Sequence, residues 1–188
     1  MNDATSILRK EHDAILKMLE AAEEVARQLR GGQKVAPHVL DGLLEFLQLF
    51  ADRCHHGKEE DLLFPTLESK GMPRMGGPIG VMLHEHDLGR SLIRQMTEAS
   101  KAYAGGATDA GPQWAGAAVE YSRLLQEHIY KENNILFVMA EQMLSDEEQR
   151  QLAAQFEKVE LERMGAGTHD RLHKLMDTLT AEIFQHQK

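Results

Sequence analysis

Two stretches of the sequence repeat each other: residues 55–64 read HHGKEEDLLF and residues 128–137 read HIYKENNILF. In both, a histidine precedes a glutamate by four residues, and a phenylalanine follows that glutamate by five. Four residues are about one turn of an α-helix, so the histidine and the glutamate of each copy share one helix face. The repeat therefore predicts two equivalent helices, each presenting a His-Glu pair.

A Glu-His-Asp triplet lies upstream of each copy, at residues 11–13 and 85–87. His12 precedes His55 by nearly the same length of chain as His86 precedes His128. The two halves are thus copies of one helix-pair unit. We expect the following six side chains to converge at the centre: His12, His55, Glu59, His86, His128 and Glu132.

The remaining sequence predicts helices only, because apolar residues recur at helical spacing and no segment alternates with a period of two. Breaks rich in Gly and Pro separate four predicted helices, at residues 5–30, 37–65, 79–103 and 113–143. Four antiparallel helices with short loops form an up-down-up-down bundle around one core. We therefore predict an all-α fold in which residues 1–144 are a four-helix bundle.

Residues 145–188 are predicted to form a C-terminal helical hairpin. Ser145 and Glu148 have the spacing of a capping box, which begins a helix that we expect to end near Met164. Thr168 is the predicted cap of a last helix ending near Gln185. The apolar stripes of this hairpin either cover one side of the bundle or form a homodimer interface, so the chain is a monomer or a homodimer.

The first copy contains an ambiguity of register, because His56 and Glu60 are also four residues apart. Only His55 and Glu59 keep the five-residue offset to Phe64 that the second copy shows. In a regular α-helix the next residue is turned about 100° away. We therefore expect His56 and Glu60 to point toward the rim or the solvent.

Two buried glutamates need neutralisation, since an unpaired carboxylate in an apolar core costs several kcal/mol. Neither Lys nor Arg lies on the predicted inner stripes, so divalent cations are the simplest explanation. Each carboxylate can bridge two ions while two imidazoles complete each ion. Imidazole and carboxylate ligands without thiolate suit iron or manganese and are tolerated by zinc. Two iron ions are the predicted cofactor.

The sequence resembles the hemerythrin-like, or HHE cation-binding, domain family over about residues 6–143. The resemblance is carried by the motifs KEHDAI, HHGKEEDLLFP, HEHDLGR and HIYKENNILF. The resemblance implies a four-helix bundle holding an oxo- or hydroxo-bridged di-iron centre. Carried over position by position, it implies His12, His55, His86 and His128 as ligands, with Glu59 and Glu132 as bridges.

Within this family the oxygen carriers have a fifth histidine four residues before the ligand of the third helix. Met82 stands at that position here, which favours ligand activation or sensing over stable oxygen carriage. The stretch MGGPIGVMLHEHD at residues 75–87 resembles bacterial di-iron proteins that repair damaged iron centres, without their N-terminal cysteine domain.

Four further positions are candidates for the surroundings of the metals or for a ligand pocket. Gly89 either leaves space for an exogenous ligand or allows a close helix contact. His84 is expected at the rim; the alternative is that it contacts a metal ligand or serves as an alternate ligand itself. Tyr121 either donates to a metal-bound ligand or packs. Met82 lies on the core stripe.

Composition excludes several classes of function. Lys and Arg number 21 against 30 Asp and Glu, giving a formal charge of −9, so we expect no nucleic-acid partner. One Cys excludes a disulfide framework, and no apolar run has membrane-spanning length, so we expect a cytoplasmic protein without a membrane partner. The predicted function is binding or sensing of dioxygen or nitric oxide; iron-centre repair, peroxide turnover and metal storage are the alternatives. No general acid or nucleophile is legible, which favours a binding protein over an enzyme.

Overall fold

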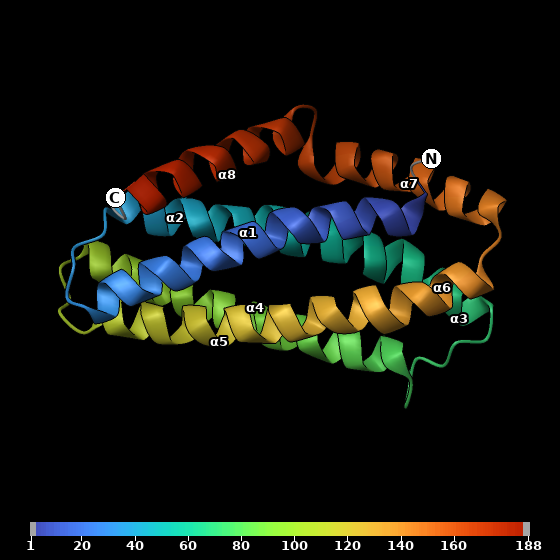
Figure 1. Cartoon of the computed structure of the whole chain (residues 1–188), viewed down its shortest axis with the longest axis horizontal. Coiled ribbons are helices and arrows are strands. Elements are labelled where there is room, and N and C mark those ends of the chain that lie inside the picture. The colour runs from blue at the N-terminus through green and yellow to red at the C-terminus, as the bar shows by residue number, and fades with distance from the viewer. Residues whose placement is uncertain (1–2, 186–188) are drawn as a thin grey trace.

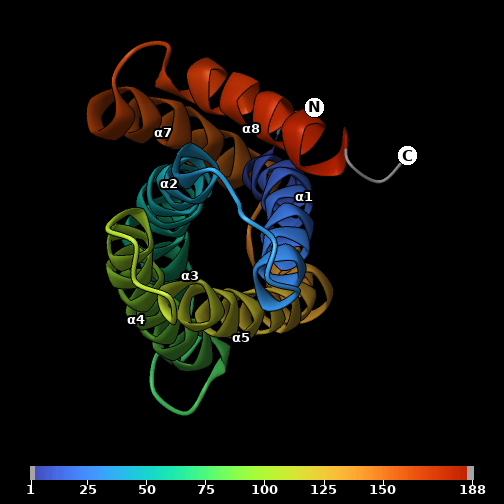
Figure 2. The same cartoon turned by 90° about the vertical axis from the view of Figure 1, so that its left-hand side faces the viewer.

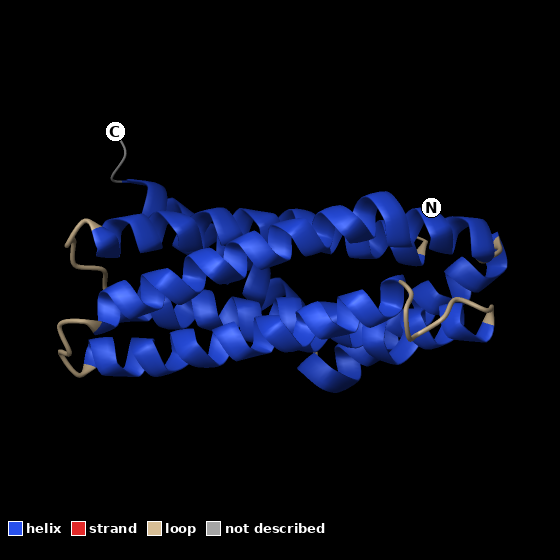
Figure 3. Cartoon of the chain, turned by 90° about the horizontal axis from the view of Figure 1, so that it is seen from below, coloured by secondary structure: helices blue, strands red, loops and turns tan. Residues whose placement is uncertain are grey.

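The computed structural model describes residues 3–185, and all regular structure in this range is helical (Figures 1 and 3). The elements in chain order are α1 (Ala4–Arg30), α2 (Pro37–Phe46), η1 (Leu47–His56), η2 (Glu59–Leu63), α3 (Phe64–Ser69), α4 (Pro78–Ala104), α5 (Ala110–Lys131), η3 (Glu132–Leu136), α6 (Phe137–Met143), α7 (Asp146–Met164) and α8 (Thr168–Phe184). Those labelled η are π-helices, whose hydrogen bonds span five residues instead of four. The last three residues of the predicted hairpin, 186–188, lie outside the described range.

The predicted four-helix bundle is confirmed. Figure 2 looks along it: α1, the α2-to-α3 rod, α4 and the α5-to-α6 rod surround a common core, and α7 and α8 lie outside α1 and α2. Two clusters of buried apolar side chains fill this core. In α1, His12 lies between Leu8 of one cluster and Ile15 of the other. The polar layer is therefore enclosed by apolar layers along the bundle axis.

The C-terminal hairpin packs on the bundle through both of its helices. Leu172 and Leu179 of α8 belong to the larger apolar cluster, and Phe156 of α7 belongs to the smaller one. A Cβ atom on Gly42 would lie 3.0 Å from Leu179, so α8 approaches the α2 backbone closely. Of the two arrangements left open by the sequence, this structure contains the one in which the hairpin covers a side of the bundle.

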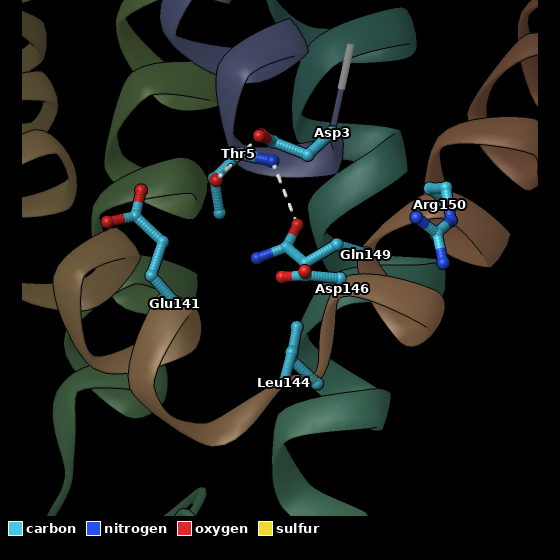
Figure 4. A pocket seen from close by; sticks show the side chains of 7 residues that line it. All are labelled: Asp3, Thr5, Glu141, Leu144, Asp146, Gln149 and Arg150. Carbon is cyan, nitrogen blue, oxygen red and sulfur yellow. Dashed lines mark hydrogen bonds between the residues drawn. The ribbon is translucent and has the colours of Figure 1, made fainter. Parts of the chain in front are cut away.

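At the other end of the hairpin, α7 also contacts the start of α1. The Thr5 amide donates to the side-chain oxygen of Gln149 over 3.3 Å. These residues line a pocket of about 280 Å³ together with Asp3, Glu141 and Arg150 (Figure 4). The pocket contains none of the predicted metal ligands.

Three predicted helix boundaries can be compared with the structure. Ser145 and Glu148 form the predicted capping box. Thr168 is not the cap of α8: Gly167 takes that position, and the Thr168 hydroxyl donates to the Met164 carbonyl. Pro65 does not end the second rod, which continues to Ser69, because it falls in the first turn of α3, where its missing N–H costs no hydrogen bond.

The π-helices shift the inward face by one residue in both halves. The regular spacing predicts Leu62 and Ile135 as the next inward residues after the two glutamates. The structure buries Leu63 and Leu136 completely instead, while Ile135 is 50% exposed. Segments η2 and η3 begin at Glu59 and Glu132, so the extra residue in each turn explains the same error in both halves. Within residues 3–185, no helix is long and apolar enough to cross a membrane.

Candidate metal centre

The six predicted ligands meet in the centre of the bundle, where each is no more than 1% exposed. They belong to two groups of potential ligand atoms, each within 4.8 Å of one another, and the groups share Glu59. Position A comprises His12, His55, Glu59 and Glu132, and position B comprises His56, Glu59, His86 and His128.

Both glutamates reach histidines of both positions. One Glu59 oxygen lies 3.4 Å from His55 Nε2, and the other lies 3.4 Å from His86 Nε2. Oε2 of Glu132 lies 3.1 Å from His12 Nε2 and 3.3 Å from His128 Nε2. Two ligand atoms at right angles around one ion, each about 2.1 Å from it, are roughly 3 Å apart. The spacing suits two carboxylates that bridge two ions.

Each of the four predicted histidine ligands is oriented through its Nδ1 atom. The partners and distances are Asn133 Oδ1 for His12 (2.9 Å), Glu11 for His55 (2.9 Å), Glu60 for His86 (2.7 Å) and Glu85 for His128 (3.0 Å). A carboxylate or an amide oxygen accepts a hydrogen bond, so Nδ1 carries the proton and donates it. Every Nε2 therefore presents a lone pair to the centre, as in metal-ligating histidines.

These orienting groups repeat with the sequence duplication. Glu11 precedes His12 and accepts from His55, as Glu85 precedes His86 and accepts from His128. A lysine three residues after the bonded histidine pairs with each carboxylate: Lys58 with Glu11, and Lys131 with Glu85. These four residues are not among the predicted site residues, although their shared spacing in the two halves is a signal that could have identified them.

Phe64 and Phe137, whose matching offsets helped to align the halves, stack on histidines. The Phe137 ring lies 5.4 Å from the His12 ring at 4°, and the Phe64 ring lies 6.0 Å from the His86 ring at 18°. Each phenylalanine thus covers the triplet histidine of the other half. The ligands are held between aromatic rings and out of contact with water.

The electrostatics of the two glutamates are those of a site built for cations. Burial and the facing charge of Glu132 raise the pKa of Glu59 well above its ordinary value. Burial also acts to raise the pKa of Glu132, but the neighbouring imidazoles of His128 and His12 hold it below its usual range. No Lys or Arg within residues 3–185 pairs with either glutamate: the buried Lys58 bonds to Glu11 and Glu160 instead.

The donor set fits divalent metal ions. Eight of the ten buried side-chain N and O atoms without a hydrogen-bond partner in the described chain belong to this centre, including all four oxygens of Glu59 and Glu132. Buried polar atoms are nearly always paired, so such a concentration indicates a missing partner. Imidazole nitrogens and carboxylate oxygens without thiolate suit iron, manganese and zinc.

The prediction for His56 is wrong. Its side chain is buried, 3% exposed, and joins position B, where its ring stacks on that of His86 with centroids 3.9 Å apart. The cause is the π-helix η1. Residues five positions apart share a face of a π-helix, whereas in an α-helix the spacing is about four. The inward face therefore moves on by one residue and includes His56 beside His55. Glu60 is half-buried and accepts from His86 rather than facing solvent alone.

The four surrounding candidates differ in outcome. His84 is exposed on α4 and belongs to neither position, in agreement with a rim residue. Gly89 allows a close helix contact: a Cβ there would lie 3.4 Å from the Tyr121 ring. Tyr121 is buried and its hydroxyl has no hydrogen-bond partner within the described chain. Met82 packs in the smaller apolar cluster beside the centre.

A third group of possible ligands lies between the bundle and the hairpin, formed by Glu11, Glu160 and His169. It borders a cavity of about 400 Å³ that His173 also lines. Lys58 bonds to both glutamates and already supplies the positive charge that a cation would bring. This group therefore holds Glu11, the hydrogen-bond partner of His55, in place and is not a separate metal site.

The family is decided by a sequence match across the bundle. The sequence model of the hemerythrin HHE cation-binding domain matches residues 3–140. The chain belongs to this family. The match covers all six predicted ligands and ends at the last turns of the bundle, so the hairpin lies outside it.

Similarity to curated proteins extends the comparison. The chain is 35% identical over 135 residues to the iron-sulfur cluster repair protein YtfE of Edwardsiella ictaluri, covering 70% of this chain and 60% of that protein. It is 35% identical over 144 residues to YtfE of Musicola paradisiaca, covering 71% and 62%. It is 26% identical over 171 residues to the uncharacterized protein Rv1995 of Mycobacterium tuberculosis, covering 90% and 66%. The chain thus spans about three fifths to two thirds of the length of these relatives.

Proposed function

We propose that this chain is a non-haem di-iron protein whose centre binds a small diatomic ligand, dioxygen or nitric oxide. The observation that carries the proposal is the pair of ligand groups that share Glu59 and are bridged again by Glu132. A single-ion site would not need two buried carboxylates that each reach histidines on both sides. Two ferrous ions, when bound, supply electrons and coordination positions for the diatomic ligand.

The protein's own residues prepare this chemistry. Glu11, Glu60 and Glu85 fix the tautomer of their histidines, so the Nε2 lone pairs are available without rearrangement. Burial excludes bulk water from the ligands and from any molecule held among them. Burial and the charge of Glu132 raise the pKa of Glu59 well above its ordinary value, so protonation of this carboxyl competes with metal binding.

The test is anaerobic loading with Fe(II), followed by metal analysis and by titration of the loaded protein with nitric oxide and with dioxygen under optical observation. We expect about two irons per chain and a spectral change that saturates with one of the gases. His12→Ala should lose metal. The matched control is His84→Ala, which removes an exposed histidine two residues before His86 and should retain metal. One iron or none in the unaltered chain would refute the proposal.

A second candidate function, repair of damaged iron centres, is supported by the similarity to the two YtfE proteins. Its test is recovery of an iron–sulfur enzyme inactivated by nitric oxide after incubation with the iron-loaded chain. The matched control is the same chain carrying His12→Ala. Recovery that depends on His12 would favour repair over ligand binding alone.

A further inference from the structure

The two halves of the centre differ at one connected set of side chains. Asp52 and His56 lie on η1, and Arg90 reaches Asp52 from α4. The duplication aligns these three residues with others that are all apolar: Asp52 with Leu125, His56 with Ile129, and Arg90 with Leu16. Three apolar positions of one half thus correspond to three polar residues that are connected through Asp52 in the other.

The three polar residues form a chain of contacts that ends at His56. Arg90 Nε donates to Asp52 over 2.8 Å, and its Nη2 atom donates to Glu60 over 2.6 Å. The Asp52 carboxylate lies 3.5 Å from His56 Nδ1, the nitrogen through which the other histidines are oriented. One guanidinium therefore links the carboxylates that face His56 and His86.

His56 itself lacks a hydrogen bond that would compensate for its burial. Both of its ring nitrogens are buried without a hydrogen bond, and the ring packs against those of His86 and His128. One nitrogen lies within 4.8 Å of ligand atoms of Glu59, His86 and His128. A buried imidazole nitrogen without a partner is costly, and a metal ion at position B would satisfy it.

The backbone differs between the halves at the same place. His128 and Ile129 lie in the regular helix α5, whereas His55 and His56 lie at the end of the π-helix η1. The other two π-helices, η2 and η3, do correspond under the duplication. Among the π-helices of residues 3–185, the one that brings His56 inward has no counterpart.

We infer that His56 is a fifth imidazole ligand of the centre, so that position B has three imidazoles and position A has two. This inference rests on the proposed two-metal function. Its consequence is unequal affinity: the first metal ion occupies position B, and the second occupies position A. His56 lies on the second helical rod. Met82 of α4, at the position where the oxygen carriers of the family have their fifth histidine, is a buried apolar residue.

The test compares metal titrations of the unaltered chain, His56→Ile, which copies the second half, and the control His84→Ala. The metal-free chains are titrated anaerobically with Co(II), whose optical bands report the number of ligands, and with Fe(II). We expect two separate steps in the unaltered chain and in the control. In His56→Ile the metal affinity of the first step should fall by about tenfold or more. Loss of a residue that only hydrogen-bonds to a metal ligand already lowers metal affinity by about that factor.

His56→Ala provides a second measurement if the isoleucine variant does not fold, because added imidazole should restore its first step. The thermal midpoint of the metal-free His56→Ile chain should equal or exceed that of the unaltered chain, since the variant removes a buried imidazole that makes no hydrogen bond. Identical titrations of His56→Ile and the unaltered chain would overturn the inference, and so would His56→Ala that does not respond to imidazole. Binding of fewer than two ions by the unaltered chain would instead overturn the proposed function.

Discussion

The Nε2 atoms of His86 and His128 lie 3.2 Å apart, although both rings already donate through Nδ1. Two imidazole lone pairs that face each other at this distance repel unless a proton or a cation lies beside them. The carboxylates on Nδ1 keep the rings in this orientation. The protein therefore maintains a locally unfavourable arrangement that a metal ion at position B would make favourable.

Metal binding should consequently stabilise the fold. Only the folded chain brings the ligands together, so free metal at about 100 times its dissociation constant adds about 2.7 kcal/mol to the free energy of unfolding. Calorimetry of the iron-loaded protein before and after removal of the metal by a chelator measures the effect. Equal thermal midpoints in the two states would contradict it. The His12→Ala chain should show little difference between them.

The carboxylates on the Nδ1 atoms should tune metal affinity without being ligands. We expect Glu85→Gln, which removes the charge that His128 and Lys131 contact, to weaken metal binding by about 10- to 100-fold. Glu20→Gln on the exposed face of α1 is the matched control. Competition with a chelator of known affinity gives both values. The interpretation would be wrong if the two variants bound metal equally well.

Gly89 should tolerate one added carbon but not a large side chain. An alanine Cβ would lie 3.4 Å from the Tyr121 ring, an ordinary contact, and alanine favours a helix by up to about 1 kcal/mol over glycine. Leucine would displace that ring and cost about 1–3 kcal/mol. Urea unfolding of metal-free Gly89→Ala and Gly89→Leu tests this order. A leucine variant as stable as the alanine one would mean that open space lies beside Gly89.

Much of the fold and of the centre was predictable because the duplication supplies information that a local pattern lacks. A single His-xxx-Glu pair is compatible with a surface helix, but two copies with matching phenylalanines select His55 over other readings of the first copy. Helical periodicity then places His12 and His86 on inward faces. The structure brings these residues together with Glu59 and Glu132.

The errors of register at the centre have one physical source. Periodicity arguments assume a constant number of residues per turn, and η1, η2 and η3 change that number at the centre. A constant register therefore places His56 at the rim and puts Leu62, rather than Leu63, on the inward face. Residue propensities do not predict a π-helix. The neighbouring histidines His55 and His56, which align with His128 and Ile129, nevertheless mark the place where the regular register fails.

The metal-free protein should lose stability as the pH falls below neutrality. Burial lowers the pKa of His55 from 6.5 to about 4, and it lowers the pKa values of His56 and His86 as well. The folded chain keeps these rings neutral, while the unfolded chain protonates them below pH 6.5. Their contribution is therefore complete above pH 6.5 and is lost as the pH falls toward 4. For His55 alone it is on the order of 3 kcal/mol.

Glu59 acts in the opposite direction, because its raised pKa favours the folded chain at low pH. Three histidines outweigh one carboxyl, so the net slope of the unfolding free energy should be positive between pH 4 and 6.5. Urea unfolding of the metal-free chain at several pH values measures it. His55→Gln, which cannot titrate, should flatten the slope, and His84→Ala should leave it unchanged. An unaltered slope in His55→Gln would show that this ring is not held neutral by the fold.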